Sequence, residues 1–149
     1  MDLEEEEKLP DFVGINHYDG VDIIEIKTHL KHALTYDSSH KNFAFSTELS
    51  KAIIQVTNYM DALVQDKFTR TEDKQAITTL TGEAHVYRPR AIIIISSSDR
   101  LVSRQQQYDK EQITRDFTKL RNSLNGIEIL TFDEVISMAR RYKENIAVE

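Results

Sequence analysis

The spacing of apolar and polar residues predicts a β-hairpin near the start of the chain. Apolar residues are dense in residues 10–16 and again in residues 20–27. Between these two runs stand Asp19 and Gly20, a dipeptide typical of hairpin turns. The polar residues 29–42 that follow are expected to form a connection without regular structure.

The middle of the chain predicts one long amphipathic helix. Through residues 45–66 apolar positions recur at intervals of three and four, with Ser46 or Thr47 as alternative N-cap residues. Residues 67–88 fit neither period clearly. A structureless link of that length is unusual inside a compact domain, so a short hairpin or a functional loop is expected there.

The last third of the chain alternates again between strand and helix patterns. Residues 90–96 form an apolar run typical of a strand buried on both faces. A helix is expected over residues 103–124, and a short strand over residues 126–130. Thr131 with Glu134 three residues later forms a capping box that opens a final helix. This order predicts an α/β fold with a mixed central sheet flanked by helices.

Two charged residues interrupt the second strand of the predicted hairpin. Alternate residues of a strand share a face, so Glu25 and Lys27 stand side by side, whereas Asp22 points to the opposite face. Burying charges costs several kcal/mol each unless they are well paired. Either this strand is an edge strand with one face in solvent, or the pair has a chemical role.

A second carboxylate is placed to join this pair. Asp11, preceded by Pro10, begins the partner strand of the hairpin. Carboxylates from adjacent strands can converge on one hard cation and leave positions open for water and a phosphate oxygen. Lys27 can then hold the attacking water or stabilise negative charge in the transition state. The sequence therefore predicts a metal site on this face.

Polar residues of the long helix share one side with its apolar stripe. At ~100° per residue, Glu48, Gln55 and Tyr59 fall within about 40° of one another. From there they can reach a site on the sheet below. The alternative is a set of boundary residues without a role.

Composition narrows the classes of protein that fit. The chain has 149 residues, a net charge of −6 and no cysteine, which excludes disulfides and cysteine-bound zinc. Its acidic start differs from a signal peptide, and no apolar run is long enough for a membrane span. A single soluble, cytoplasmic domain is expected. The net charge argues against a broad nucleic-acid-binding surface, although a local basic strip is compatible with it.

Several basic residues are candidates for contacting the phosphates of a nucleic acid. The alternative is a scatter of solvated surface residues. The candidates are His29, Arg88, Arg90, Arg100 and Arg104.

The order of these motifs resembles the PD-(D/E)XK nuclease superfamily, which joins "PD", "EIK" and a helical Gln-x-x-x-Tyr motif. More narrowly, "DIIEIKTH", "FSTELSKAIIQVTNY", "RPRAIIIISSSDR" and "IEILTFDEVI" resemble the nuclease domain of the Shedu antiphage-defence proteins. The resemblance runs from about Pro10 to Arg140.

The resemblance implies a restriction-endonuclease-like core and metal-dependent cleavage or nicking of DNA during defence against phage. It also implies a homo-oligomer that uses Mg²⁺ or Mn²⁺, with no small-molecule cofactor and no membrane partner. The implied metal ligands are Asp11, Glu25 and the backbone carbonyl of Ile26, with Glu48 as a further candidate. The other implied catalytic residues are Lys27, Gln55 and Tyr59.

One departure from the superfamily pattern leaves two alternatives for the domain and two for the function. Only nine residues precede Pro10, where the superfamily usually has a helix and a strand. Residues 1–149 are therefore either a single nuclease domain or the catalytic fragment of a longer protein. The alternative function is a non-catalytic DNA-binding or assembly module that retains the nuclease fold.

Overall fold

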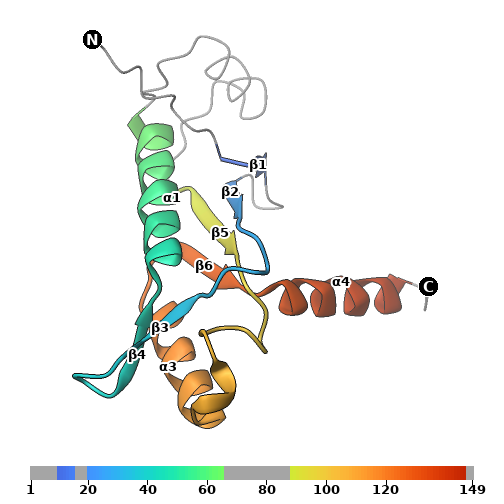
Figure 1. Ribbon diagram of the computed structural model, residues 1–149. Helices are drawn as coiled ribbons and strands as arrows, with labels where there is room; N and C mark the ends of the chain where they lie inside the picture. The colour runs from blue at the N-terminus through green and yellow to red at the C-terminus, as the bar shows by residue number, and fades with distance from the viewer. Residues whose placement is uncertain (1–9, 16–19, 66–87, 147–149) are drawn as a thin grey trace.

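A four-stranded mixed sheet forms the centre of the molecule (Figure 1). The computed structural model describes residues 10–15, 20–65 and 88–146. The strand order is β1-β2-β5-β6, with β1 antiparallel to β2 and the other neighbours parallel. The strands are β1 (Phe12–Ile15), β2 (Val21–Ile26), β5 (Arg90–Ile94) and β6 (Ile127–Leu130). The predicted hairpin and the mixed α/β class are confirmed.

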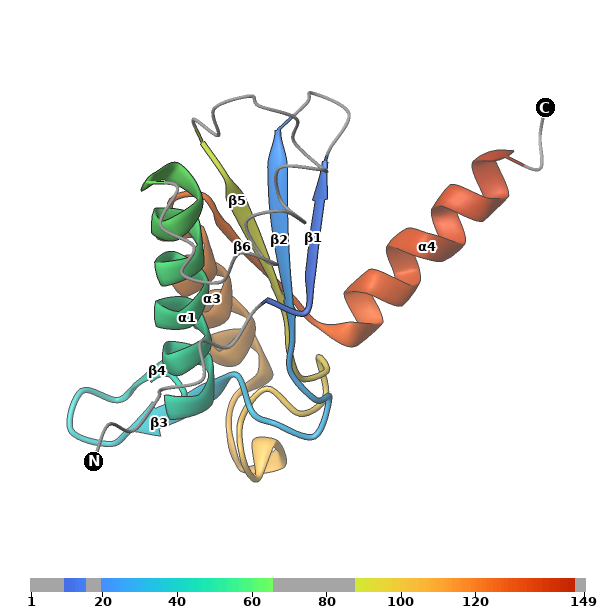
Figure 2. The same cartoon turned by 90° about the horizontal axis from the view of Figure 1, so that it is seen from above.

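The helices are not distributed evenly over the two faces of this sheet. Figure 2 shows α1 and α3 on one side, while α4 leads away on the other. The elements are α1 (Thr47–Gln65), the 3₁₀ helix η1 (Gln105–Gln107), α3 (Lys110–Asn122) and α4 (Phe132–Ile146). One face of the sheet is therefore packed under helices.

The packed face holds the main core. In β2 the residues Val21, Ile23 and Glu25 are buried, whereas the alternate residues are not. β5 repeats this pattern with Ala91 and Ile93 buried. The expectation that the apolar run 90–96 is buried on both faces is therefore wrong for β5. Its second face is only partly covered, because neither α1 nor α3 lies on that side.

A second, two-stranded sheet lies where a structureless connection was expected. β3 (Leu34–Asp37) and β4 (Asn42–Phe45) pair antiparallel. The expectation of an irregular connection is wrong because this segment contains the core residue Leu34, and its strand pairs with β4, which carries the core residue Phe43 directly after the segment. Phe43 also packs against the ring of Tyr108, with centroids 5.3 Å apart. The small sheet thereby joins the main core.

Local hydrogen bonds explain where the helices begin. The Ser46 hydroxyl accepts from the Leu49 N–H at 3.1 Å, so Ser46, one of the two candidates, caps α1. α3 begins later than expected because the Asp109 carboxylate caps it, accepting from the Glu111 N–H at 3.2 Å. The predicted turn at Asp19 and segment 67–87 lie outside the described residues.

Candidate active site

Glu25 and Lys27 face helix α1 rather than solvent. β2 lies between β1 and β5, and Glu25 is only 4% exposed on the side where α1 packs. The edge-strand interpretation is therefore wrong. The Lys27 ammonium donates to Glu25 Oε1 at 2.6 Å, so the buried carboxylate has a charged partner.

The pair continues into helix α1 as a chain of hydrogen bonds. Lys27 Nζ also donates to Gln55 Oε1 at 3.3 Å. The amide nitrogen of Gln55 in turn donates to the Tyr59 hydroxyl at 2.7 Å. Gln55 and Tyr59 are one helical turn apart, so both can face the end of β2. The geometry thus joins four of the predicted residues and holds Lys27 in one orientation.

Asp11 approaches the same end of β2 from the neighbouring strand. The register pairs Phe12 with Ile24, so the preceding residue, Asp11, comes beside Glu25. Asp11 Oδ2 accepts from the Ile26 N–H at 2.7 Å, which fixes its carboxylate there. Two carboxylates from adjacent strands thereby lie at one end of the sheet.

The electrostatics of Tyr59 reflect this arrangement. Burial raises the pKa of its phenol above the ordinary value of 10.0. The hydrogen bond from Gln55 lowers this pKa, while the negative charges of Glu25 and Asp11 raise it further. Tyr59 is therefore protonated at neutral pH and can act as a hydrogen-bond donor.

One oxygen of the site has no partner among the described residues. Glu25 Oε2 is buried without any hydrogen bond. Such an atom costs about 1–3 kcal/mol or more, so it is expected to have a ligand. The described residues contain no group of three or more His, Cys, Asp or Glu side chains suited to a metal. Mg²⁺ often binds through only one or two carboxylates plus waters and phosphate, so Asp11 and Glu25 fit it.

Two other acidic residues lie away from this site. Glu48 instead approaches Lys31, at 3.7 Å, and its side chain is half exposed. It lies seven positions before Gln55, about 10 Å along the helix axis, so shared angular phase alone does not bring the two together. Asp22 binds Arg90 at 3.2 Å on the opposite face of the strand, as its odd spacing predicts.

The basic candidates divide between the two ends of the sheet. Arg90 lies opposite Asp22 in the register, and Arg88 just precedes it, so both are far along the strands from Glu25. Arg100 and His29 instead follow the carboxyl ends of β5 and β2. His29 lies edge-on to the ring of Phe132, with centroids 6.0 Å apart. Arg104 is exposed at the start of η1.

Ser96 lies beside the carboxyl ends of β2 and β5 and has a structural role that the sequence pattern does not indicate. Ser96 is fully buried and has a φ of 64°, a left-handed conformation that is rare outside glycine. Its N–H donates to the Thr28 carbonyl at 3.4 Å, and its carbonyl accepts from the Phe132 N–H at 3.0 Å. Ser96 thus links the residue after Lys27 to the start of α4.

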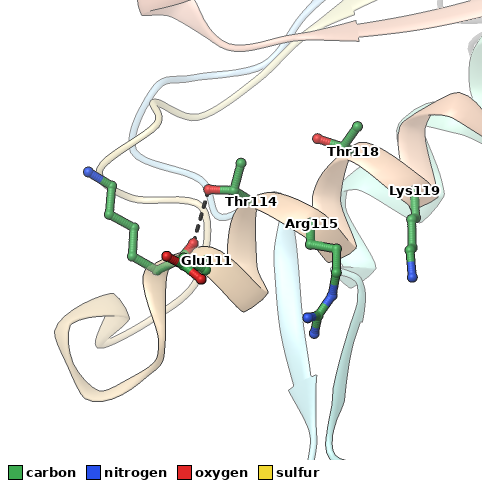
Figure 3. A pocket seen from close by; sticks show the side chains of 6 residues that line it. Glu111, Thr114, Arg115, Thr118 and Lys119 are labelled. Carbon is green, nitrogen blue, oxygen red and sulfur yellow. Dashed lines mark hydrogen bonds between the residues drawn. The ribbon is translucent and has the colours of Figure 1, made fainter.

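A separate hollow lies on the outer side of α3 (Figure 3). It has a volume of about 590 Å³. Its lining residues are Lys110, Glu111, Thr114, Arg115, Thr118 and Lys119. None of them belongs to the site at β2, and Thr114 donates within its own helix to the Lys110 carbonyl at 3.0 Å. This hollow is therefore distinct from the acid–lysine site.

The fold and site define a mixed α/β domain in which a buried glutamate is paired with a lysine beneath a helix. The family model described as "Shedu protein SduA, C-terminal" matches residues 2–136. The chain belongs to this family, which associates it with antiphage defence. No curated protein matches the chain. In the described residues, no helix is both long enough and apolar enough to cross a membrane.

Proposed function

We propose that this protein is a metal-dependent deoxyribonuclease of the PD-(D/E)XK superfamily that nicks or cleaves DNA in antiphage defence. The observation that supports it best is Glu25. One oxygen of this buried carboxylate binds Lys27, and the other has no hydrogen-bond partner among the described residues. A carboxylate kept in this state is suited to a cation.

Five residues of the site have a role in this proposal. Asp11 and Glu25 bind Mg²⁺ or Mn²⁺, with the Ile26 carbonyl as a further ligand. When bound, the metal lowers the pKa of a coordinated water and stabilises charge on the phosphate. Lys27 orients the attacking water and stabilises the negative charge that develops on the phosphate. Gln55 holds Lys27 in place through the hydrogen bond described above.

The test measures cleavage of supercoiled plasmid with Mg²⁺, with Mn²⁺ and with a chelator. We expect metal-dependent nicking that falls at least about 100-fold in Glu25→Gln and in Lys27→Ala, because electrostatic groups of this kind contribute that much. Asp22→Asn is the matched control, since it removes a carboxylate from the opposite face of the same strand. It should keep its activity.

Two further measurements separate the possible failures. Mg²⁺ binding by calorimetry should be lost in Glu25→Gln whether or not the DNA is cut. Metal binding and DNA binding without any cleavage would favour the non-catalytic DNA-binding module. Equal loss of activity in Asp22→Asn would show that the assay reports folding and not the site.

A further inference from the structure

Lys27 lowers the negative charge of the candidate active site by half. Asp11 and Glu25 contribute two negative charges in their ionised forms, and Lys27 contributes one positive charge, so the three together carry −1. Among the described residues, no ion pair other than that of Glu25 with Lys27 reaches any of the three. Tyr59 adds no charge, because its phenol is protonated at neutral pH. The site is therefore less negative than its two carboxylates suggest.

Lys27 is held where its charge acts directly on Glu25. Its ammonium donates to Glu25 Oε1 at 2.6 Å and to Gln55 Oε1 at 3.3 Å, so two partners fix its position. The Lys27 side chain is 27% exposed and the Glu25 side chain only 5%. Charges interact more strongly at such a position than on an open surface, because less water screens them. A cation at the other carboxylate oxygen, Glu25 Oε2, is therefore repelled by this ammonium.

A divalent cation needs more negative charge than this site supplies. Mg²⁺ usually keeps several waters in proteins and is bound by one or two carboxylates together with phosphate oxygens of the substrate. Because the site carries a net charge of −1, half of the charge of Mg²⁺ stays uncompensated there. Each phosphate of a DNA strand carries one negative charge and offers oxygen ligands. One DNA phosphate therefore supplies the charge that the site lacks.

We propose that Lys27 makes cation binding at Asp11 and Glu25 depend on DNA. The protein alone binds Mg²⁺ weakly, whereas the protein and a DNA phosphate together bind it firmly. This inference rests on the proposed nuclease function and adds a form of regulation to it, since the site is completed only at its substrate. Coupling between two ligands is reciprocal, so Mg²⁺ strengthens DNA binding by the same factor.

The alternative is that Lys27 has a purely structural role as the partner of the buried Glu25 carboxylate. In that case, a neutral side chain that still donates to Glu25 leaves the coupling unchanged. Lys27→Gln is the variant that separates the two, because its amide donates hydrogen bonds but carries no charge. Lys27→Arg is its counterpart, because it keeps the positive charge and changes the shape.

The first experiment measures Mg²⁺ binding to the protein alone by titration calorimetry. We expect Lys27→Gln to bind Mg²⁺ at least about 10-fold more tightly than the wild type, because the positive charge beside the cation is removed. Lys27→Arg should bind Mg²⁺ as the wild type does. Urea denaturation without Mg²⁺ checks that each variant is folded under the conditions of the titration. Equal or weaker binding by folded Lys27→Gln would overturn the proposal.

The second experiment measures the coupling between the cation and DNA. The affinity for a short fluorescent duplex is measured by anisotropy with Ca²⁺ and with a chelator, where Ca²⁺ replaces Mg²⁺ as another hard cation with oxygen ligands. We expect Ca²⁺ to strengthen DNA binding at least about 10-fold in the wild type and less than about 3-fold in Lys27→Gln. The matched control is Lys31→Gln, which removes the same charge from the half-exposed pair with Glu48. It should keep the wild-type coupling.

The outcomes distinguish this inference from the proposed function. Coupling of equal size in the wild type and Lys27→Gln, or its loss in Lys31→Gln, would overturn the inference alone. Binding of neither Mg²⁺ nor Ca²⁺ by any of the proteins, with or without DNA, would show that Asp11 and Glu25 are not a metal site. The proposed function would then fail together with the inference.

Discussion

Glu25 is a residue that folding alone does not select. Removing a carboxylate from water costs several kcal/mol, and hydrophobic residues of similar volume are often equally or more stable in its place. Its neighbours on the buried face, Val21 and Ile23, show what the strand otherwise uses there. Lys27 offsets part of this cost through the contact at 2.6 Å.

Because the buried Glu25 depends on Lys27 as its charged partner, removing Lys27 should lower the stability of the fold. This change can be measured without an activity assay. In Lys27→Met we expect the free energy of unfolding to fall by about 3 kcal/mol, because Glu25 loses the partner of its buried charge. Urea denaturation measures it. The double variant Glu25→Gln/Lys27→Met should recover most of this loss.

The matched control is Lys31→Met. Lys31 and Glu48 form a half-exposed pair at 3.7 Å, so this change should cost less than about 1 kcal/mol. Equal effects in the two lysine variants would contradict the special position of Lys27.

The strand and helix periods of the sequence could predict only in part which residues lie around Glu25. Alternation along β2 placed Glu25 and Lys27 on one face and Asp22 on the other, and the structure agrees. Helix phase grouped Gln55 with Tyr59 correctly but added Glu48, because an angle ignores distance along the axis. Ser96 could not be foreseen, since its left-handed backbone is held by hydrogen bonds to two segments far away in the sequence, at Thr28 and at Phe132.

Among the elements, α4 shows that local sequence signals can predict the residue at which a helix begins but not the direction in which the helix points. Thr131 and Glu134 predicted its start, and the reciprocal hydrogen bonds confirm it. Its direction depends on Arg121 and Ser98, which come from other elements. The β3–β4 hairpin was missed for a similar reason, because its core residues pack against α3 and Tyr108 as well as against each other.

The anchor of α4 should be sensitive to acid. Burial raises the pKa of Asp133, but hydrogen bonds from Ser98 outweigh this and hold the pKa below its ordinary value of 3.8. A lowered folded-state pKa stabilises the fold above about pH 4, and this contribution is lost as the pH falls further. The difference in Tm between wild type and Asp133→Asn should therefore shrink between about pH 6 and pH 3. A constant difference would contradict it.

For the whole molecule, the main sheet is packed under α1 and α3 on one face, while its other face is only partly covered.

Ser96 connects two distant parts of the domain through the hydrogen bonds of its backbone. Its backbone connects the start of α4 to Thr28, and Thr28 follows directly after Lys27. α4 is about 22 Å long, and two hydrogen bonds through Ser96 join its first residue to the residue after Lys27. A substitution that displaces the start of α4 should therefore also shift the backbone beside Lys27, whereas Asp22 and Arg90 at the far end of the strands lie outside this connection.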